Sequence, residues 1–412
     1  MINLLTWHAG YARLIGVDLV RGVAAALCLA VSALLGAAPA AASSLLAPAV
    51  GAADSATAGT RVADPHTPSA ALFANPAGLT GFETFTHGGG FGIAYGRARI
   101  EASMPAGFSE SHSVWTVIPD FGVSIPYDNR WRFALGSYGS TGSKFDFGPD
   151  PASGVPSFFS EMAMAAFPLG IGYRLSDRFS VGGEVAPLFG QLRTHFPLGG
   201  LDFRYKINGP GVQGMLGATL RLNEEWAFGV GARTPGMVWM TGSMALPGGV
   251  RQGVHSDLEM PAQIFLGATW RGLPRLVLSS SVRFTDSSSL GDSPIEYDLT
   301  PQANSGFVPD SHDEWKFALA GEYAMQEQTK LRLSASWAPH IVGSNGVNPL
   351  VFDADDTKIN AGVGREFGRW TIDLTAGFAL PGERHIPPSE ALVFPGGYSM
   401  EGAVIFLGLM RR

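Results

Sequence analysis

The feature that most constrains this chain is a strand pattern of period two that recurs along most of its length. From Trp370 to Leu380, large apolar residues occupy every second position, and small or polar residues fill the positions between them. The same alternation runs from Leu331 to Trp337 and from Trp226 to Arg233. Successive side chains of a strand point to opposite faces, so each segment has one apolar and one polar face. We therefore expect an all-β protein.

Short polar segments divide these strands into pairs. Tight turns are expected where polar residues, glycine or proline interrupt the alternation, at 127–130, 176–178, 223–225, 272–274, 326–329 and 368–369. The other connections are longer. These boundaries give about fourteen strands with six short turns and seven longer loops, an even number that suits a transmembrane antiparallel β-barrel.

Composition and aromatic placement agree with a barrel in a membrane. Only 15% of the residues are charged, whereas about 25% are charged in a typical soluble domain. Aromatic residues flank the expected short turns, namely Trp131, Phe179, Trp226, Trp270 and Trp370. Aromatic rings favour the interface between membrane and water, so this placement predicts one aromatic girdle. A soluble β-sandwich would also alternate, but it gives no reason for aromatics to recur beside the turns.

The N-terminus has the pattern of an export signal. Arg13 and Arg21 precede an apolar run from Val23 to Ala38, which is followed by small residues suited to signal peptidase. We expect residues 1–42 to be a signal peptide; the alternative is a retained membrane anchor. Cys28, the only cysteine, lies in this run, so its removal would leave a mature chain without thiols.

Signatures of catalysis are absent from the sequence. It has no nucleophile elbow, zinc-binding helix or phosphate-binding loop, and its nine histidines lack ligand spacing. The triad-like residue types in Ser311–Glu314 are neighbours in sequence and rarely converge on one atom. We expect no enzyme activity, no cofactor and no metal, with an outer-membrane enzyme as the weaker alternative. The net charge of -7 argues against a nucleic-acid partner.

The segment before the first expected strand has a different character. Residues Ser44–Phe82 do not alternate and are rich in alanine, glycine, proline and threonine. The segment is too long for a simple tail and too apolar for a solvated linker. We expect residues 43–83 to form a plug within the lumen and residues 84–412 to form the barrel.

One expected loop is rich in aromatic residues. The stretch from Lys144 to Phe159 contains Phe145, Phe147, Phe158 and Phe159. Exposed aromatics at this density often form a contact surface, so we interpret the four rings as a landing groove that captures an apolar ligand. The alternative is that they pack among the other loops and cap the barrel.

The plug segment resembles a known family. Ala70–Leu79, with the sequence Asn75-Pro76-Ala77 at its centre, resembles the hatch segment of FadL-type outer-membrane transporters. Further stretches look like the barrel of that family: Arg233–Pro235, Leu258–Pro261, Thr357–Phe367 and a final pair of strands ending near Leu409. The resemblance spans nearly the whole mature chain. Two departures are that the chain ends in Met410-Arg411-Arg412 rather than in an aromatic residue, and that it is somewhat short for a fatty-acid transporter.

The resemblance implies a fourteen-stranded barrel with an N-terminal hatch inside its lumen. It implies uptake of long-chain fatty acids or of small aromatic hydrocarbons such as toluene. Movement of Asn75, Pro76 and Ala77 would govern passage. Strand three, roughly Trp131–Ser140, would carry an inward kink, for which Gly136 and Gly139 are suitable residues.

These features together predict passive transport of a hydrophobic small molecule across the bacterial outer membrane. Leaving a chain of roughly twelve methylenes in water costs on the order of 10 kcal/mol, so the ligand should stay covered and leave sideways near strand three. The expected surroundings are outer-membrane lipid and lipopolysaccharide, and the expected state is a monomer. The runner-up function is a nonspecific diffusion porin with a water-filled lumen.

Overall fold

The computed structural model describes residues 46–103, 108–149, 155–198, 201–301, 305–351, 353–391 and 394–412. The expected signal peptide, which includes Arg13, Arg21 and Cys28, lies outside the described residues, as do the first residues of the expected plug. Within the described part of the chain, the helices are all too short to cross a membrane.

Strands make up most of the chain after residue 85. They are β1 (Thr86–Ala102), β2 (Ser109–Pro126), β3 (Trp131–Phe147), β4 (Phe158–Ala166), β5 (Leu169–Arg174), β6 (Phe179–Leu198), β7 (Leu201–Arg221), β8 (Trp226–Arg233), β9 (Gly236–Ala245), β10 (Arg251–Met260), β11 (Gln263–Leu273), β12 (Leu276–Thr285), β13 (Pro294–Tyr297), β14 (Ser305–Gly306), β15 (Glu314–Gln326), β16 (Thr329–Ala338), β17 (Asp356–Phe367), β18 (Trp370–Ile386) and β19 (Gly396–Arg411).

These segments form a closed antiparallel barrel of fourteen strands, as the sequence predicts. The barrel closes where β19 pairs with β1 along its whole length. Three barrel strands consist of two segments each. β4 and β5 both pair with β3 and β6, β8 and β9 both pair with β7, and β10 and β11 pair with β9 and β8 in turn. Pro168, Pro235 and Pro261 lie in the three interruptions. Proline has no N–H for the ladder, so a strand commonly breaks there.

The two faces of the barrel wall differ as the alternation predicts. On β18, the side chains of Leu374 and Phe378 are 47% and 57% exposed on the outer face. Asp373 and Thr375, which flank Leu374 and face the lumen, are only 4% and 1% exposed. The same division holds along β8 and β16. The barrel therefore has an apolar outer face and a polar inner wall.

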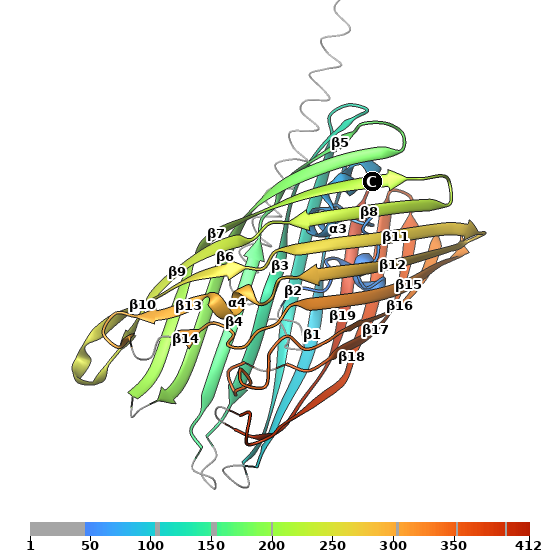
Figure 1. Ribbon diagram of the computed structural model, residues 1–412. Coiled ribbons are helices and arrows are strands. Elements are labelled where there is room, and N and C mark those ends of the chain that lie inside the picture. The colour runs from blue at the N-terminus through green and yellow to red at the C-terminus, as the bar shows by residue number, and fades with distance from the viewer. Residues whose placement is uncertain are drawn as a thin grey trace, which may run out of the picture.

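The short connections lie at one end of the barrel, which we call the turn end. All six predicted turns are confirmed, although the turn between β11 and β12 lies at residues 274–275. Trp131, Phe179, Trp226 and Trp370 are exposed beside these turns, with Trp270 less exposed next to Trp226. The C-terminus is at the same end, where the N–H of Arg412 donates to the carbonyl of Arg369 (Figure 1).

The longer connections lie at the opposite end, which we call the loop end. The largest joins β12 to β15 and carries α4 (Ser289–Asp292), β13 and β14, while η2 (Pro247–Gly249) lies between β9 and β10. The prediction of seven longer loops is wrong at one place. Leu198 of β6 pairs directly with Leu201 of β7, so only residues 199–200 connect these two strands. The two strands instead extend together as a long hairpin.

The N-terminal segment, residues 46–83, is enclosed by the strands (Figure 1). It contains α2 (Ala52–Ala56), α3 (Pro68–Ala74) and η1 (Pro76–Gly81). All three are short, and α3 and η1 each begin after a capping residue: Thr67 accepts a hydrogen bond from the N–H of Ala70, and Asn75 accepts one from the N–H of Ala77.

Candidate functional site

The N-terminal segment touches the inner wall on several sides. Glycines of the wall allow this close approach, because the segment occupies the space that a Cβ atom would take. A Cβ on Gly182 of β6 would lie 2.5 Å from the backbone of Pro76 and Ala77. A Cβ on Gly229 of β8 would lie 2.6 Å from the backbone of Ala63. Small inward-facing residues therefore shape the barrel lumen around this segment.

Asn75 is the main polar contact between the segment and the wall. Its side chain is fully buried, and its amide donates to the carbonyl of Val62, the carbonyl of Ala218 and the hydroxyl of Thr219, at 2.9–3.1 Å. Its side-chain oxygen accepts from the N–H of Ala77 at 3.1 Å. The residue thus ends α3, starts η1 and attaches both to β7. Pro76 and Ala77, also singled out in the sequence, are buried beside it.

A charged cluster provides a second attachment that the sequence analysis missed. Arg332 of β16 donates to Glu322 of β15 at 2.7 Å and to Asp373 of β18 at 2.6 Å. From the segment, His66 lies 2.9 Å from Glu322 and Arg61 lies 3.6 Å from it. All are buried or nearly so. The sequence does place charged residues at inward-facing positions of three expected strands, namely Glu322, Arg332 and Asp373. Their partners in the segment lie about 250 residues away in sequence, so the pairing could not be predicted.

The barrel wall splits between β2 and β3. These strands pair only from Asp120 with Tyr138 to Pro126 with Arg132. Toward the loop end, β2 continues to pair with β1 and β3 with β4, so the two edges separate. A β-bulge in β3, between Gly139 and Thr141, bends the strand at this point. The split therefore lies on strand three, where the sequence analysis placed a kink.

The two glycines predicted for the kink have different surroundings. A Cβ on Gly139 would meet only Ile118 of β2, across the split, at 3.9 Å. A Cβ on Gly136 would instead lie 3.0 Å from Leu72 of α3 and 2.9 Å from the carbonyl oxygen of Phe121. Gly139 thus borders the split, and Gly136 allows α3 to pack against the wall.

A cavity of about 150 Å³ lies between the segment and this part of the wall. Its lining is mainly apolar and includes Leu46, Pro48, Ile118, Pro119 and Met164, so it reaches both edges of the split. Two lysines, Lys316 of β15 and Lys358 of β17, also line it. The Lys358 amine lies 2.7 Å from Asp356, whereas the buried Lys316 amine lies 3.8 Å from the same carboxylate. The cavity therefore combines apolar walls with basic groups.

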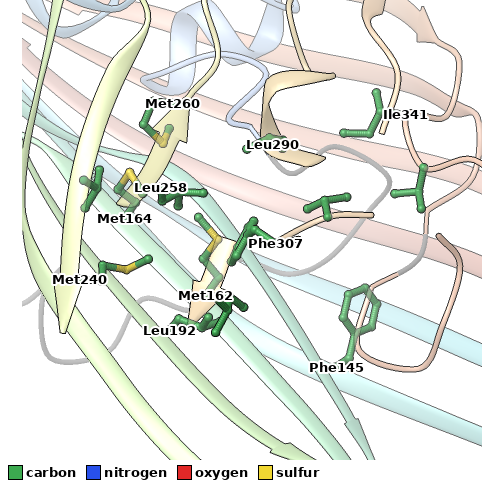
Figure 2. Packing of buried hydrophobic residues seen from close by; sticks show 14 of the residues in the cluster. Phe145, Met162, Met164, Leu192, Met240, Leu258, Met260, Leu290, Phe307 and Ile341 are labelled. Atoms are coloured by element: carbon green, nitrogen blue, oxygen red, sulfur yellow. The ribbon is translucent and has the colours of Figure 1, made fainter. Parts of the chain in front are cut away.

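The loop end of the lumen is filled by a large apolar cluster (Figure 2). Met162 and Met164 of β4 meet Met240 of β9 and Met260 of β10, with Leu290 and Phe307 from the connection between β12 and β15. Phe73 of α3 belongs to the same cluster, so the cluster joins the N-terminal segment to the loops. Long methionine side chains adapt their shape readily.

The four phenylalanines predicted for an external loop lie on strands instead. Phe145 and Phe147 are on β3 and Phe158 is on β4, and all three are buried in the apolar cluster. Phe159 alone lies partly exposed on the other side of β4, with the Lys144 amine 5.8 Å from its ring centre. The expectation of an exposed loop is therefore wrong for these residues, because β3 and β4 extend through their positions. The bulge in β3 turns Phe145 and Phe147 inward. Their role in ligand capture stays a prediction.

Arg233 forms a third attachment, between the wall and α3. Its guanidinium group lies 4.9 Å from the ring centre of Phe73 and 5.4 Å from that of Phe265. It also donates to Gln263 at 2.8 Å and to the carbonyl of Phe73. Cation–π contacts of this kind are strengthened by burial. Phe73 is thereby fixed between the N-terminal segment and the apolar cluster.

Comparison with solved structures finds this fold in outer-membrane transporters. The crystal structure of a Pseudomonas aeruginosa FadL homologue has a TM-score of 0.75 at 15% identity, covering 89% of this chain and 99% of that chain. The P. putida toluene transporter TodX has a TM-score of 0.70 at 16% identity, covering 89% and 99%. The Ralstonia pickettii toluene transporter TbuX has a TM-score of 0.66 at 17% identity, covering 89% and 98%.

No protein-family model matches this chain, and no curated protein sequence matches it. The similarity at these low identities is therefore one of fold. The shared fold is that of FadL-type transporters, as the resemblance in Ala70–Leu79 implied.

Proposed function

We propose that this chain, which has the fold of the FadL-type transporters, carries small hydrophobic molecules across the bacterial outer membrane by passive diffusion. The apolar outer face of the barrel would lie in outer-membrane lipid, next to lipopolysaccharide, and the protein would act as a monomer. The aromatic residues beside the turns would mark one membrane interface. The function is transport, without catalysis or a cofactor.

The observation that carries this proposal is the split between β2 and β3 beside an apolar cavity. Each methylene moved from apolar surroundings into water costs about 0.8 kcal/mol, so an apolar ligand is held back from an aqueous exit. A cavity that reaches both edges of a wall split offers a covered route. The ligand would leave the cavity sideways and enter the membrane between Ile118 and Gly139.

The N-terminal segment would act as the hatch, with residues 43–83 as its extent. It fills the lumen next to the cavity and is attached to the wall by Asn75, by the charged cluster and by Arg233. Its apolar side chains, such as Leu72, Phe73 and Leu79, pack in the buried apolar clusters, and the polar attachments hold it to the wall at defined points. Movement of Asn75, Pro76 and Ala77 away from β6 and β7 would enlarge the cavity.

The cavity favours a ligand with a negatively charged head. Around it, the cationic side chains of Arg283, Lys316 and Lys358 face the carboxylates of Glu314 and Asp356. One positive charge thus remains unbalanced, and the buried Lys316 amine has no hydrogen-bond partner among the described residues. An uncompensated buried charge is costly, so a ligand carboxylate bound next to the Lys316 amine would be stabilised by the ion pair. We therefore favour long-chain fatty acids; aromatic hydrocarbons such as toluene are the second candidate class.

Capture at the loop end would involve the apolar cluster. Phe145, Phe147 and Phe158 would line an interior route rather than a surface groove, with Phe159 at its outer side. The adjoining methionines could shift to admit ligands of different shape. Unchanged oleate uptake after replacement of all four phenylalanines by serine would remove this part of the proposal.

Uptake of radiolabelled oleate and toluene by cells expressing the chain tests the proposed function. Gly139→Trp fills the split and should lower oleate uptake at least about tenfold, since the covered route is blocked. Gly321→Trp is the matched control, because a Cβ there meets only Leu278, at 3.6 Å, on the outer face of β15. It should leave uptake unchanged. Equal uptake by the two variants would refute lateral exit, and ion conductance without uptake of either ligand would favour a porin.

A further inference from the structure

His66 lies between two carboxylates that belong to different parts of the molecule. Its Nδ1 is 3.1 Å from Asp54 in α2, and its Nε2 is 2.9 Å from Glu322 in β15. The side chain is 11% exposed, and both carboxylates are more deeply buried. Among the described residues, His66 alone forms an ion pair with Asp54. The imidazole therefore bridges the N-terminal segment and the barrel wall.

Both contacts require a donor on the ring. A neutral imidazole has one N–H and one nitrogen with a lone pair, so it can donate to only one of two carboxylates. Its other nitrogen would then face a negatively charged oxygen. The imidazolium form carries an N–H on each nitrogen and satisfies both carboxylates. The geometry thus fits the protonated form of His66.

The surrounding charges agree with a protonated His66. The groups that face this site are the carboxylates of Asp54, Asp64, Glu322 and Asp373 and the guanidinium groups of Arg61, Arg271 and Arg332. Four negative groups meet three positive groups, so a charged His66 makes the cluster neutral. Asp120 of β2 lies beyond the cluster and is linked to Asp54 through Ser69 and Thr67.

We propose that His66 is a proton-dependent clamp that holds the N-terminal segment against β15. Protonation closes the clamp, and loss of the proton weakens it, because a lone pair then faces Asp54 or Glu322. Histidine is the side chain that changes charge near neutral pH. This inference rests on the proposed function in one respect: if the segment is the hatch, its release is favoured as the pH rises.

Protons can reach the clamp from the turn end. A polar cavity of about 430 Å³ is lined there by His66 and Glu322, together with Arg61, Arg271 and residues of the turns. His66 is therefore not sealed within the apolar part of the lumen, and its protonation can follow the pH at the turn end. The clamp would respond to the compartment that this end faces.

Hydrogen exchange of the purified full-length protein tests the clamp. Protection factors of amides in residues 61–72 are compared at about pH 5.5 and about pH 8, after correction for intrinsic exchange rates. In the wild type, protection should fall about tenfold at the higher pH. In His66→Gln, the side-chain amide can donate to only one of the two carboxylates, so the amides of residues 61–72 should be weakly protected at both pH values. His66→Arg keeps the charge and should be well protected at both.

His340→Gln is the matched control, because His340 pairs with Asp355 in a loop at the other end of the barrel. It should retain the wild-type response in residues 61–72. A pH response that survives His66→Gln, or a wild type without any response, would overturn the proposal. Exchange requires no transport, so a protein that shows the clamp response but takes up neither oleate nor toluene contradicts only the proposed function.

Discussion

At the scale of single residues, Gly182 and Gly183 test whether the segment needs its close fit to the wall. The two neighbours on β6 face opposite sides. A Cβ on Gly182 would lie 2.5 Å from the backbone of Pro76 and Ala77, whereas one on Gly183 would meet only Leu216 and Met215, at 3.4 and 3.7 Å. We expect Gly182→Ala to destabilise the packing of the segment by about 2 kcal/mol, through overpacking.

Gly183→Ala should stay within about 0.5 kcal/mol of the wild type, since the added methyl group would make only ordinary van der Waals contacts. The measurement is the exchange protection of residues 75–81 in both variants. Similar protection in the two would show that the segment does not depend on the wall glycines.

Lys316 tests the preference for a charged ligand. Lys316→Met keeps a long side chain but removes the amine, so oleate uptake should fall about tenfold while toluene uptake is unchanged. The control is Lys330→Met, because Lys330 lies at the turn end, away from the apolar cavity. A parallel loss of both ligands in Lys316→Met would point to a structural role for the lysine and against a headgroup site.

Some residues of the site could be predicted from the sequence and others could not. Asn75, Pro76 and Ala77 stand in a short contiguous motif, and the structure places them together at the wall. The bridge from His66 to Glu322 joins residues 256 positions apart, and it exists only because the barrel closes around the segment. The pattern of residues along the chain does not indicate that two residues so far apart in sequence come into contact.

At the scale of elements, β3 and β4 extend into the stretch that the sequence analysis assigned to a loop, and the bulge in β3 determines which way its phenylalanines face. One extra residue shifts the alternation by one position, so Phe145 and Phe147 face the lumen instead of the surface. Deleting Ser140 should reverse this shift and expose both rings. We expect a loss of several kcal/mol of folding free energy, on the order of 2–4 kcal/mol for each ring removed from the core.

The fraction of folded barrel on unheated gels measures the effect of the deletion. Deleting Gly148, which follows β3 and has no neighbouring atom near its Cβ position, is the control. It shortens the chain equally without changing the phase of the strand. An equal yield of folded barrel from the two deletions would mean that the bulge does not set the orientation of these phenylalanines.

The loop between β16 and β17, residues 339–355, should respond to pH through Asp353. This carboxylate accepts from the N–H groups of Ile341 and Val342 and from Arg384, yet burial raises its pKa from 3.8 to about 6. A carboxyl whose pKa is higher in the folded state stabilises that state when protonated. The stabilisation is therefore complete below about pH 4 and is lost as the pH rises through about 6.

Limited proteolysis of this loop at about pH 5 and about pH 7 tests whether the loop loses stability as the pH rises. Cleavage within residues 339–355 should be faster at the higher pH in the wild type. Asp353→Asn keeps an acceptor but cannot ionise, so its cleavage rate should be nearly the same at both. If the asparagine variant shows the wild-type difference, another group is responsible.

At the scale of the whole molecule, the strand count and the turns were predictable because alternation is a local property. Each strand shows its two faces within about eight residues, and polar turns separate the strands. The split between β2 and β3 was not visible in this way, because the register between strands is set by pairing across the sheet. The short connection at residues 199–200 was missed for a related reason: the strands on either side extend far beyond the others.

The central claim is that the ligand leaves through the split between β2 and β3, and a reversible staple across it is the most direct test. Cysteines at positions 118 and 139 would face each other across the split, since a Cβ on Gly139 would lie 3.9 Å from Cγ2 of Ile118. A disulfide between them draws the two edges of the split together. The double variant is made with Cys28→Ala, which removes the only native cysteine.

Radiolabelled oleate uptake is then measured in the same cells before and after reduction. Our account predicts that uptake is blocked while the disulfide is formed and returns to the level of the wild type when dithiothreitol breaks it. Uptake at the wild-type rate through a fully oxidised staple would contradict lateral exit and would require a route through the turn end.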